Sequence, residues 1–176
     1  MSNRILKYAL YVAIALSAMG AGLWFGMSRQ VSAPEVKASS VLLALSLPDL
    51  QKKPQSLEQW RGKVLVVNFW ATWCAPCREE IPLFVKLQDK YGAKGLQFVG
   101  ISIDQDDKTA EFARNFKINY PTLIGTFDTI EVSRQAGNAK RVLPFTVILN
   151  RAGEIVATEF GGLTLEKLEA QLNPLL

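Results

Sequence analysis

The strongest constraint on the fold is a buried strand that runs directly into two closely spaced cysteines and a helix. Residues 63–70, KVLVVNFW, are an apolar run rich in β-branched and aromatic residues, which is typical of a strand buried on both faces. The sequence ATWCAPC follows at once, and from Pro76 to about Tyr91 apolar residues recur with helical spacing. Both cysteines of the chain, Cys74 and Cys77, therefore lie where a strand meets a helix.

Short apolar runs and helical patterns alternate along the rest of the chain. They predict strands at 96–103, 122–124, 145–150 and 154–160, the last two forming a hairpin, and helices at 107–116 (capped by Asp106 or Asp107), 129–136 and 163–172. This order predicts an α/β fold, a mixed central sheet with helices on both faces. At 176 residues and 49% hydrophobic content, the chain has room for one such core and little room for a second domain.

A run of 20 residues without a charged side chain, Tyr8–Met27, lies near the N-terminus. At about 1.5 Å per residue, a helix of this length spans the roughly 30 Å hydrocarbon core of a bilayer. A cleavable signal peptide is the main alternative, but its apolar region is usually about 7–15 residues long, and bulky Leu23–Phe25 closes this run. A buried helix of a soluble protein is a weaker alternative, because charge-free runs of this length are rare there. We expect residues 1–27 to be an uncleaved transmembrane anchor.

The flanks of this run indicate where the rest of the chain lies. Arg4 and Lys7 on the short side favour a cytoplasmic tail, with the following domain outside. Residues 28–40 are small and polar without periodicity, so we expect a linker between the anchor and a domain at 41–176. In a bacterium the domain then faces the periplasm or the outer wall zone, where disulfide chemistry is permitted.

Charge and composition exclude several classes of function. After the apolar run the chain carries 18 basic and 16 acidic side chains, which is too balanced for a nucleic-acid surface. It has no histidine, which excludes Ser-His and Cys-His nucleophiles, His-rich metal sites and imidazole pH switches. Two cysteines cannot supply the four ligands of a structural zinc site within one chain, and we expect neither a metal nor another cofactor.

The spacing of the two cysteines favours a redox role over a stabilising one. A stabilising disulfide closes a long loop, whereas a gap of two residues closes almost nothing. Residues i and i+3 share a helix face, so both sulfurs meet at the first turn, where Pro76 also fits. Free N–H groups and the positive helix end beside Cys74 lower the pKa of its thiol. This predicts Cys74 as the attacking nucleophile and Cys77 as the thiol that resolves the mixed disulfide.

Resolution requires a group that takes the proton of Cys77, and no histidine can do so. Glu80 lies three residues further along the helix and on the same face, whereas Glu79 lies about 200° around the axis from Cys77. We expect Glu80 to be the proton acceptor. The alternative is an ordinary carboxylate in the first turn, favoured there by the helix dipole.

These motifs resemble the active site of the thioredoxin-like superfamily, and more narrowly the membrane-tethered TlpA/ResA-type thiol-disulfide oxidoreductases of bacteria. The similarity covers roughly Leu45–Leu172 and rests on LEQWRGKVLVVNFWATWCAPCREEIP, GISIDQDD and VLPFTVILNRAGEIV. It implies a thioredoxin-like sheet, a helix-kinking proline at Pro82, and a cis peptide bond between Leu143 and Pro144 opposite the cysteines. It also implies that Leu143 presents backbone groups to an extended substrate, and that Glu80 is the acidic residue of the site.

Other residues beside the motif bear on the same chemistry. Asn68 stands where thioredoxins in general carry a buried aspartate, a replacement that the TlpA/ResA-type subgroup shares. Because an amide cannot take up a proton at neutral pH, this replacement strengthens the assignment of proton transfer to Glu80. Trp70 and Trp73 are expected to pack around the motif. Trp73, next to the nucleophile, is also a candidate for the substrate surface, together with Ala75 and Pro76.

The resemblance implies an enzyme that exchanges a dithiol for a disulfide on other proteins through a mixed disulfide at Cys74. It implies a reductase that acts on apocytochrome c or other exported proteins, with a membrane thiol carrier of the CcdA or DsbD type as electron donor. A disulfide-forming oxidase is an alternative, as is a binder with incidental thiols. A thiol peroxidase is disfavoured because Ala71, and not Thr or Ser, stands three residues before Cys74. A copper-carrying Sco-type module is disfavoured by the cysteine spacing and the lack of histidine.

Overall fold

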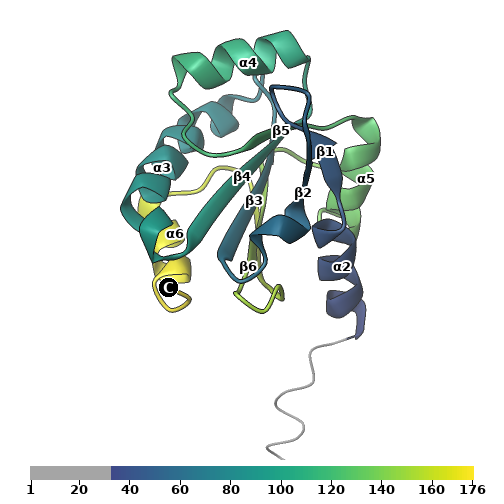
Figure 1. Ribbon diagram of the computed structural model, residues 1–176, viewed down its shortest axis with the longest axis vertical. Helices are drawn as coiled ribbons and strands as arrows, with labels where there is room; N and C mark the ends of the chain where they lie inside the picture. Colours follow the sequence, from purple (N-terminus) through teal and green to yellow (C-terminus); the bar gives the residue numbers. More distant parts are fainter. Residues whose placement is uncertain (1–32) are drawn as a thin grey trace, which may run out of the picture. The chain divides into compact units, whose positions relative to one another are not determined.

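A computed structural model describes residues 33–176 of the chain (Figure 1). The expected anchor at 1–27 and the first part of the expected linker lie outside the described residues. Within residues 33–176, none of the helices is long and apolar enough to cross a membrane.

The centre of the fold is a five-stranded sheet in the order β5-β4-β3-β6-β7. Its strands are β3 (Val64–Trp70), β4 (Leu96–Ser102), β5 (Thr122–Ile124), β6 (Phe145–Leu149) and β7 (Ile155–Phe160). Strand β4 is parallel to β3 and β5, whereas β6 is antiparallel to β3 and β7. The mixed sheet confirms the predicted α/β class. Its central strand, β3, is the one that leads into the cysteines.

Helices cover both faces of this sheet. They are α2 (Ala33–Leu43), α3 (Ala75–Tyr91), α4 (Asp106–Asn115), α5 (Phe127–Gln135) and α6 (Leu165–Leu172). Because successive side chains of a strand point to opposite faces, Leu65, Val67 and Phe69 of β3 enter a core shared with α2, whereas Val64 and Val66 enter one shared with α3 and α6. In Figure 1, α3 and α6 accordingly lie on one side of the sheet and α2 and α5 on the other.

Helix α2 begins within the expected linker and changes the domain boundary. The segment has no marked apolar periodicity, which is why the sequence predicts a linker up to residue 40. Leu42 and Leu43 at its end are buried in the core beside β3. Tertiary packing therefore holds a helix that its local pattern does not specify, and the compact domain extends from Ala33.

Side-chain caps explain where two helices begin. Helix α5 starts at Phe127, two residues before the prediction, because Thr126 and Thr129 form a reciprocal capping box. Helix α6 starts at Leu165, two residues after the prediction, because the Thr164 side chain accepts a hydrogen bond from a first-turn N–H.

Two further details differ from the sequence analysis. The predicted cap of α4 is wrong: Gln105 occupies the N-cap position, and Asp106 and Asp107 lie in the first turn. A hairpin of β1 (Ser46–Pro48) and β2 (Pro54–Ser56), followed by the 3₁₀ helix η1 (Leu57–Trp60), precedes β3 and is absent from the prediction. A second 3₁₀ helix, η2 (Gly92–Lys94), extends α3.

Candidate active site

The two cysteines lie where the sequence predicts, at the start of α3. Cys74 is the N-cap residue, Pro76 lies in the first turn, and Cys77 lies one turn inside the helix. The structure holds the pair as a disulfide, with the two Cα atoms 5.3 Å apart. Cys74 is 6% exposed, whereas Cys77 is completely buried. Of the two sulfurs, Cys74 is the one that a partner can approach from outside.

The loop before β6 lies against this disulfide. The Leu143–Pro144 peptide bond is cis, which confirms the expectation from the resemblance. Leu143 packs against the cluster that contains Cys74 and Cys77. The Pro144 carbonyl accepts a hydrogen bond from the Gly161 N–H at 3.0 Å, which connects this loop to the segment after β7.

Glu80 is a buried carboxyl group on the face of α3 that carries Cys77. Its Oε1 atom accepts a hydrogen bond from Asn68 Nδ2 at 2.8 Å, and its Oε2 atom accepts one from the Leu163 N–H at 3.0 Å. Burial raises the pKa of Glu80 from 4.5 to about 7, although the two donors oppose this shift. Glu79, in contrast, is exposed. A carboxyl group with a pKa near neutrality can both take up and release a proton under physiological conditions.

Thr146 belongs to the same network and is a residue that the sequence analysis missed. Asn68 Nδ2 donates one hydrogen bond to Glu80 and a second to Thr146 Oγ1 at 2.9 Å. Asn68 and Thr146 are directly paired across β3 and β6, and both are buried. A signal was present, because each is a polar residue within an otherwise apolar strand. Leu163 gave no such signal, since it contributes a backbone group.

The two tryptophans of the motif have different surroundings. Trp70 is buried and packs against Phe112, with ring centroids 5.1 Å apart, as expected. Trp73 does not pack inside: its side chain is 69% exposed. Ala75 and Pro76 are exposed as well, so three of the residues that the sequence analysis proposed for substrate contact are exposed beside Cys74.

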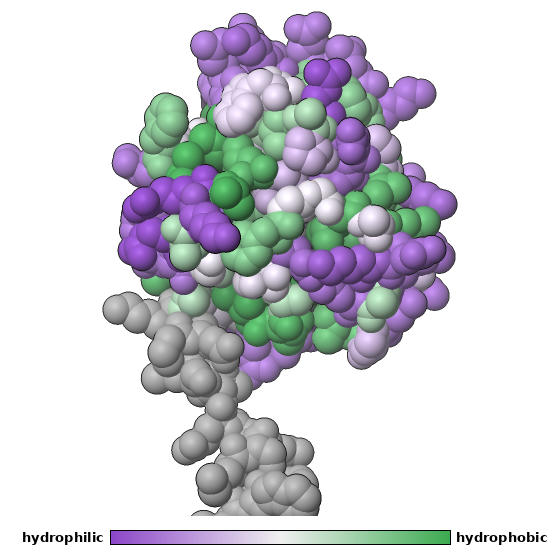
Figure 2. Space-filling model, turned by 180° about the vertical axis from the view of Figure 1, so that it is seen from behind, coloured by the Kyte–Doolittle hydropathy of each residue, from purple (hydrophilic) through white to green (hydrophobic). Residues whose placement is uncertain are grey.

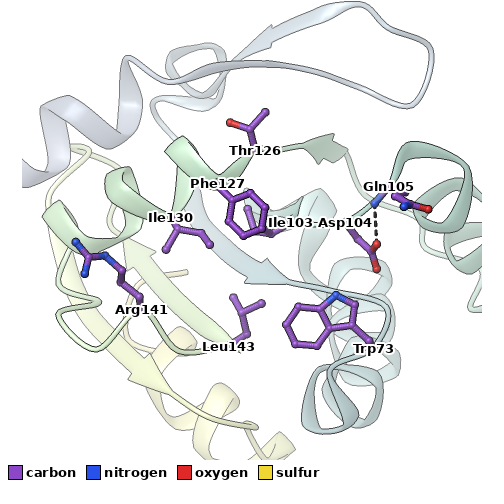
Figure 3. Close-up of a pocket in the computed structure, with 10 residues that line it drawn as sticks. Trp73, Ile103, Asp104, Gln105, Thr126, Phe127, Ile130, Arg141 and Leu143 are labelled. Carbon is purple, nitrogen blue, oxygen red and sulfur yellow. Dashed lines mark hydrogen bonds between the residues drawn. The ribbon is translucent and has the colours of Figure 1, made fainter.

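An apolar groove of about 500 Å³ begins beside Trp73. Its apolar walls come from the motif, from the end of β4, from α5 and from the cis-proline loop: they are Trp73, Ile103, Phe127, Ile130 and Leu143. Figure 3 shows these side chains turned toward a common hollow. Phe127 is 86% exposed and forms an outer wall. The sequence analysis did not identify this groove.

The groove has a polar rim. Partial burial acts to raise the pKa of Asp104, but hydrogen bonds from Thr72 and Gln105 outweigh it and hold this pKa below its usual value. On the opposite side Arg141 pairs with Glu131 at 3.1 Å. The rim therefore carries a negative charge at Asp104 and a positive charge at Arg141, on opposite sides of the groove.

Apolar side chains are also exposed away from the groove, among them Val156 and Phe160 of β7. Figure 2, viewed from behind Figure 1, shows apolar patches below a hydrophilic end, which is the end that carries α4 in Figure 1. Exposure alone does not distinguish the groove from this other apolar surface. The groove differs because it is concave and continuous with the surface around Cys74.

Comparison with known proteins identifies the family. Residues 30–172 match Redoxin. The chain belongs to the Redoxin family. Within it, the chain is a ResA-type thioredoxin-like protein and a thiol-disulfide oxidoreductase, as its curated relatives and structural neighbours show.

The curated relatives include several that carry the name thiol-disulfide oxidoreductase ResA. The one from Halalkalibacterium halodurans is 31% identical over 124 residues, which is 70% of this chain and 68% of the relative. The one from Bacillus cereus is 26% identical over 172 residues, 97% of this chain and 96% of the relative. Among solved structures, a thiol:disulfide interchange protein of the thioredoxin family from Chlorobium tepidum is similar, with a TM-score of 0.68 and 26% sequence identity. The matched region covers 74% of this Redoxin chain and 92% of the Chlorobium tepidum chain.

Proposed function

We propose that this oxidoreductase reduces disulfides in other proteins outside the cytoplasmic membrane, where the expected anchor at 1–27 holds it. The observation that carries the proposal is the Cys74–Cys77 pair at the start of α3, next to the cis-proline loop and the buried Glu80. The uncharged run of 20 residues at Tyr8–Met27 supports the location.

The reaction proceeds in two exchanges. The Cys74 thiolate attacks one sulfur of a substrate disulfide, so the substrate bond breaks, a mixed disulfide forms and one substrate thiolate leaves. Cys77 then gives its proton to Glu80 and attacks the Cys74 sulfur, which releases the second substrate thiolate. Two electrons pass from the enzyme dithiol to the substrate. The enzyme is left with the Cys74–Cys77 disulfide that the structure contains.

The surface around Cys74 determines how a substrate binds. An extended substrate segment lies along the backbone of Leu143, which places its disulfide over the Cys74 sulfur. A bulky apolar side chain near the substrate cysteine then enters the groove between Trp73 and Phe127. Burial of such a side chain favours binding by roughly 1.5–3 kcal/mol, which distinguishes one protein disulfide from another.

Continued turnover requires a source of electrons. A membrane thiol carrier of the CcdA or DsbD type reduces the Cys74–Cys77 disulfide, and apocytochrome c or another exported protein is the substrate. Both assignments rest on the resemblance to TlpA/ResA-type proteins and on the ResA name of the relatives.

The test is the thiol state of the pair in living cells. Cells are quenched rapidly in acid, free thiols are alkylated with a reagent that adds mass, and the two forms are separated on a gel, with the Cys74→Ser, Cys77→Ser double variant as the zero reference. A mainly reduced pair is expected. A mainly oxidised pair in cells with an intact electron donor would refute the reductase function and indicate a disulfide-forming oxidase. A membrane-impermeant alkylating reagent should also label the reduced Cys74 thiol in spheroplasts, and complete protection of reduced Cys74 would refute the outside location.

A further inference from the structure

Asn68 has an unusual hydrogen-bond pattern for a buried amide. Its Nδ2 group makes both of its hydrogen bonds, to Glu80 Oε1 at 2.8 Å and to Thr146 Oγ1 at 2.9 Å. Its Oδ1 atom is buried and has no hydrogen-bond partner. A buried polar atom without a partner is destabilising. The two hydrogen bonds that the NH₂ group donates must therefore hold the amide in this orientation.

The two orientations of the amide suit different protonation states of Glu80. An ionised carboxylate only accepts hydrogen bonds, so it requires the NH₂ end of Asn68. A protonated carboxyl group must also donate one, but both groups that contact it now, Asn68 Nδ2 and the Leu163 N–H, are donors. If the Asn68 amide turns by 180°, its unpartnered Oδ1 atom becomes the acceptor for the Glu80 hydroxyl.

Thr146 favours one of these orientations. In the present orientation its oxygen accepts the second N–H of Asn68, and without it that N–H is buried and unpaired. In the turned orientation the Asn68 Oδ1 atom accepts from the Glu80 hydroxyl, and the Thr146 hydroxyl can donate to it as well. Without Thr146, Oδ1 keeps Glu80 as a partner, so no further buried group is left unpaired there. Loss of the Thr146 hydroxyl therefore destabilises the orientation that serves the carboxylate more than the one that serves the protonated acid.

We propose that Thr146 is a positioning residue for thiol-disulfide exchange, which acts on Glu80 through Asn68 by holding the amide with its NH₂ group toward the carboxylate. Direct pairing of Asn68 with Thr146 across β3 and β6 places the hydroxyl within reach of the amide. The consequence for catalysis rests on the proposed role of Glu80 as the proton acceptor of Cys77.

The other titratable groups near Glu80 do not obscure its titration. Burial raises the pKa of Tyr120, as does the Glu80 charge, so Tyr120 stays neutral from pH 5 to 9. Cys74 and Cys77 titrate only as free thiols, so the measurement uses the disulfide form.

The test is a titration of the Glu80 carboxyl carbon by NMR in the oxidised protein. Thr146→Val should raise the pKa of Glu80 by about one unit, a tenfold change in its acid dissociation constant, because one buried N–H loses its acceptor. Thr146→Ser keeps the hydroxyl and should restore the wild-type value. Thr122→Val is the matched control, since Thr122 is a buried strand threonine whose hydroxyl has no partner, and it should leave Glu80 unchanged.

Other outcomes overturn the inference. An unchanged Glu80 pKa in a folded Thr146→Val protein would refute the role of Thr146, as would an equal shift in Thr122→Val. If Thr146→Val does not fold, Thr146→Ala removes the same hydroxyl without adding a methyl group and takes its place. The pH profile of the disulfide-exchange rate distinguishes a failure of the Thr146 assignment from a failure of the proposed function. If the carboxyl pKa shifts and the rate profile does not follow, the assignment of Thr146 stands and the role of Glu80 as proton acceptor fails.

Discussion

The buried Glu80 carboxyl group gives the stability of the fold a specific pH dependence. Its pKa is about 7 in the folded protein and 4.5 in a solvated chain. Between these values the native state binds one more proton than the unfolded state, so the free energy of unfolding falls as pH rises. The stabilisation is complete below pH 4.5 and lost above pH 7. At about 1.4 kcal/mol per pKa unit, the loss amounts to about 3 kcal/mol.

Glu80→Gln removes this titration. The free energy of unfolding of the variant, relative to wild type, should therefore rise by about 3 kcal/mol between pH 4 and pH 8. Urea unfolding of the oxidised protein, followed by tryptophan fluorescence at several pH values, measures this difference. Glu79→Gln, a substitution at the exposed neighbouring position, should run parallel to wild type. A Glu80→Gln curve that also runs parallel to wild type would refute the reasoning.

Further predictions concern rate, selectivity and the backbone. Glu80→Gln should slow disulfide exchange by about 10² or more, since general acid–base catalysis contributes about 10²–10⁴, and a rate unchanged across pH 5–9 would remove Glu80 from the mechanism. Phe127→Ser should lower kcat/KM about tenfold for a peptide substrate with an apolar residue beside its disulfide. The kcat/KM for a small aliphatic disulfide, which has no such residue, should stay unchanged. Phe160→Ser, which lies outside the groove and is 52% exposed, should change neither, and equal losses in both variants would refute selection by the groove. Gly161 has φ +78, so Gly161→Ala should lower the free energy of unfolding in urea by about 1 kcal/mol through backbone strain alone, because nothing lies within 4 Å of the added methyl group. Gly162→Ala, where the added carbon meets Pro76 at ordinary contact distance, should cost less, and equal losses would contradict the strain argument.

The elements around the cysteines could be predicted because their signals are local. Strand β3 is buried at every position, which produces a continuous apolar run, and α3 carries its own proline and apolar periodicity. The resulting junction fixes Cys74 and Cys77 without knowledge of the rest of the chain. The inward direction of Glu80 follows from the same helix, because residues three apart share a face.

Features that depend on contacts between distant segments could not be predicted. The groove combines Trp73 with Phe127 and Ile130, which approach each other only after β5 and α5 are in place. The pairing of Asn68 with Thr146 depends on the register between β3 and β6, which no local pattern specifies. The same holds for α2, whose helix is stabilised by burial of Leu42 and Leu43.

Trapping of mixed disulfides tests the central claim most directly, namely that Cys74 attacks and Cys77 resolves. The Cys77→Ser protein is expressed in cells, thiols are quenched in acid, and adducts are separated on a non-reducing gel and mapped by mass spectrometry. Adducts that disappear on reduction and join partner proteins to Cys74 are expected, with none in a matched Cys74→Ser protein. Adducts on Cys77 in the Cys74→Ser protein, together with none on Cys74 in the Cys77→Ser protein, would contradict the account.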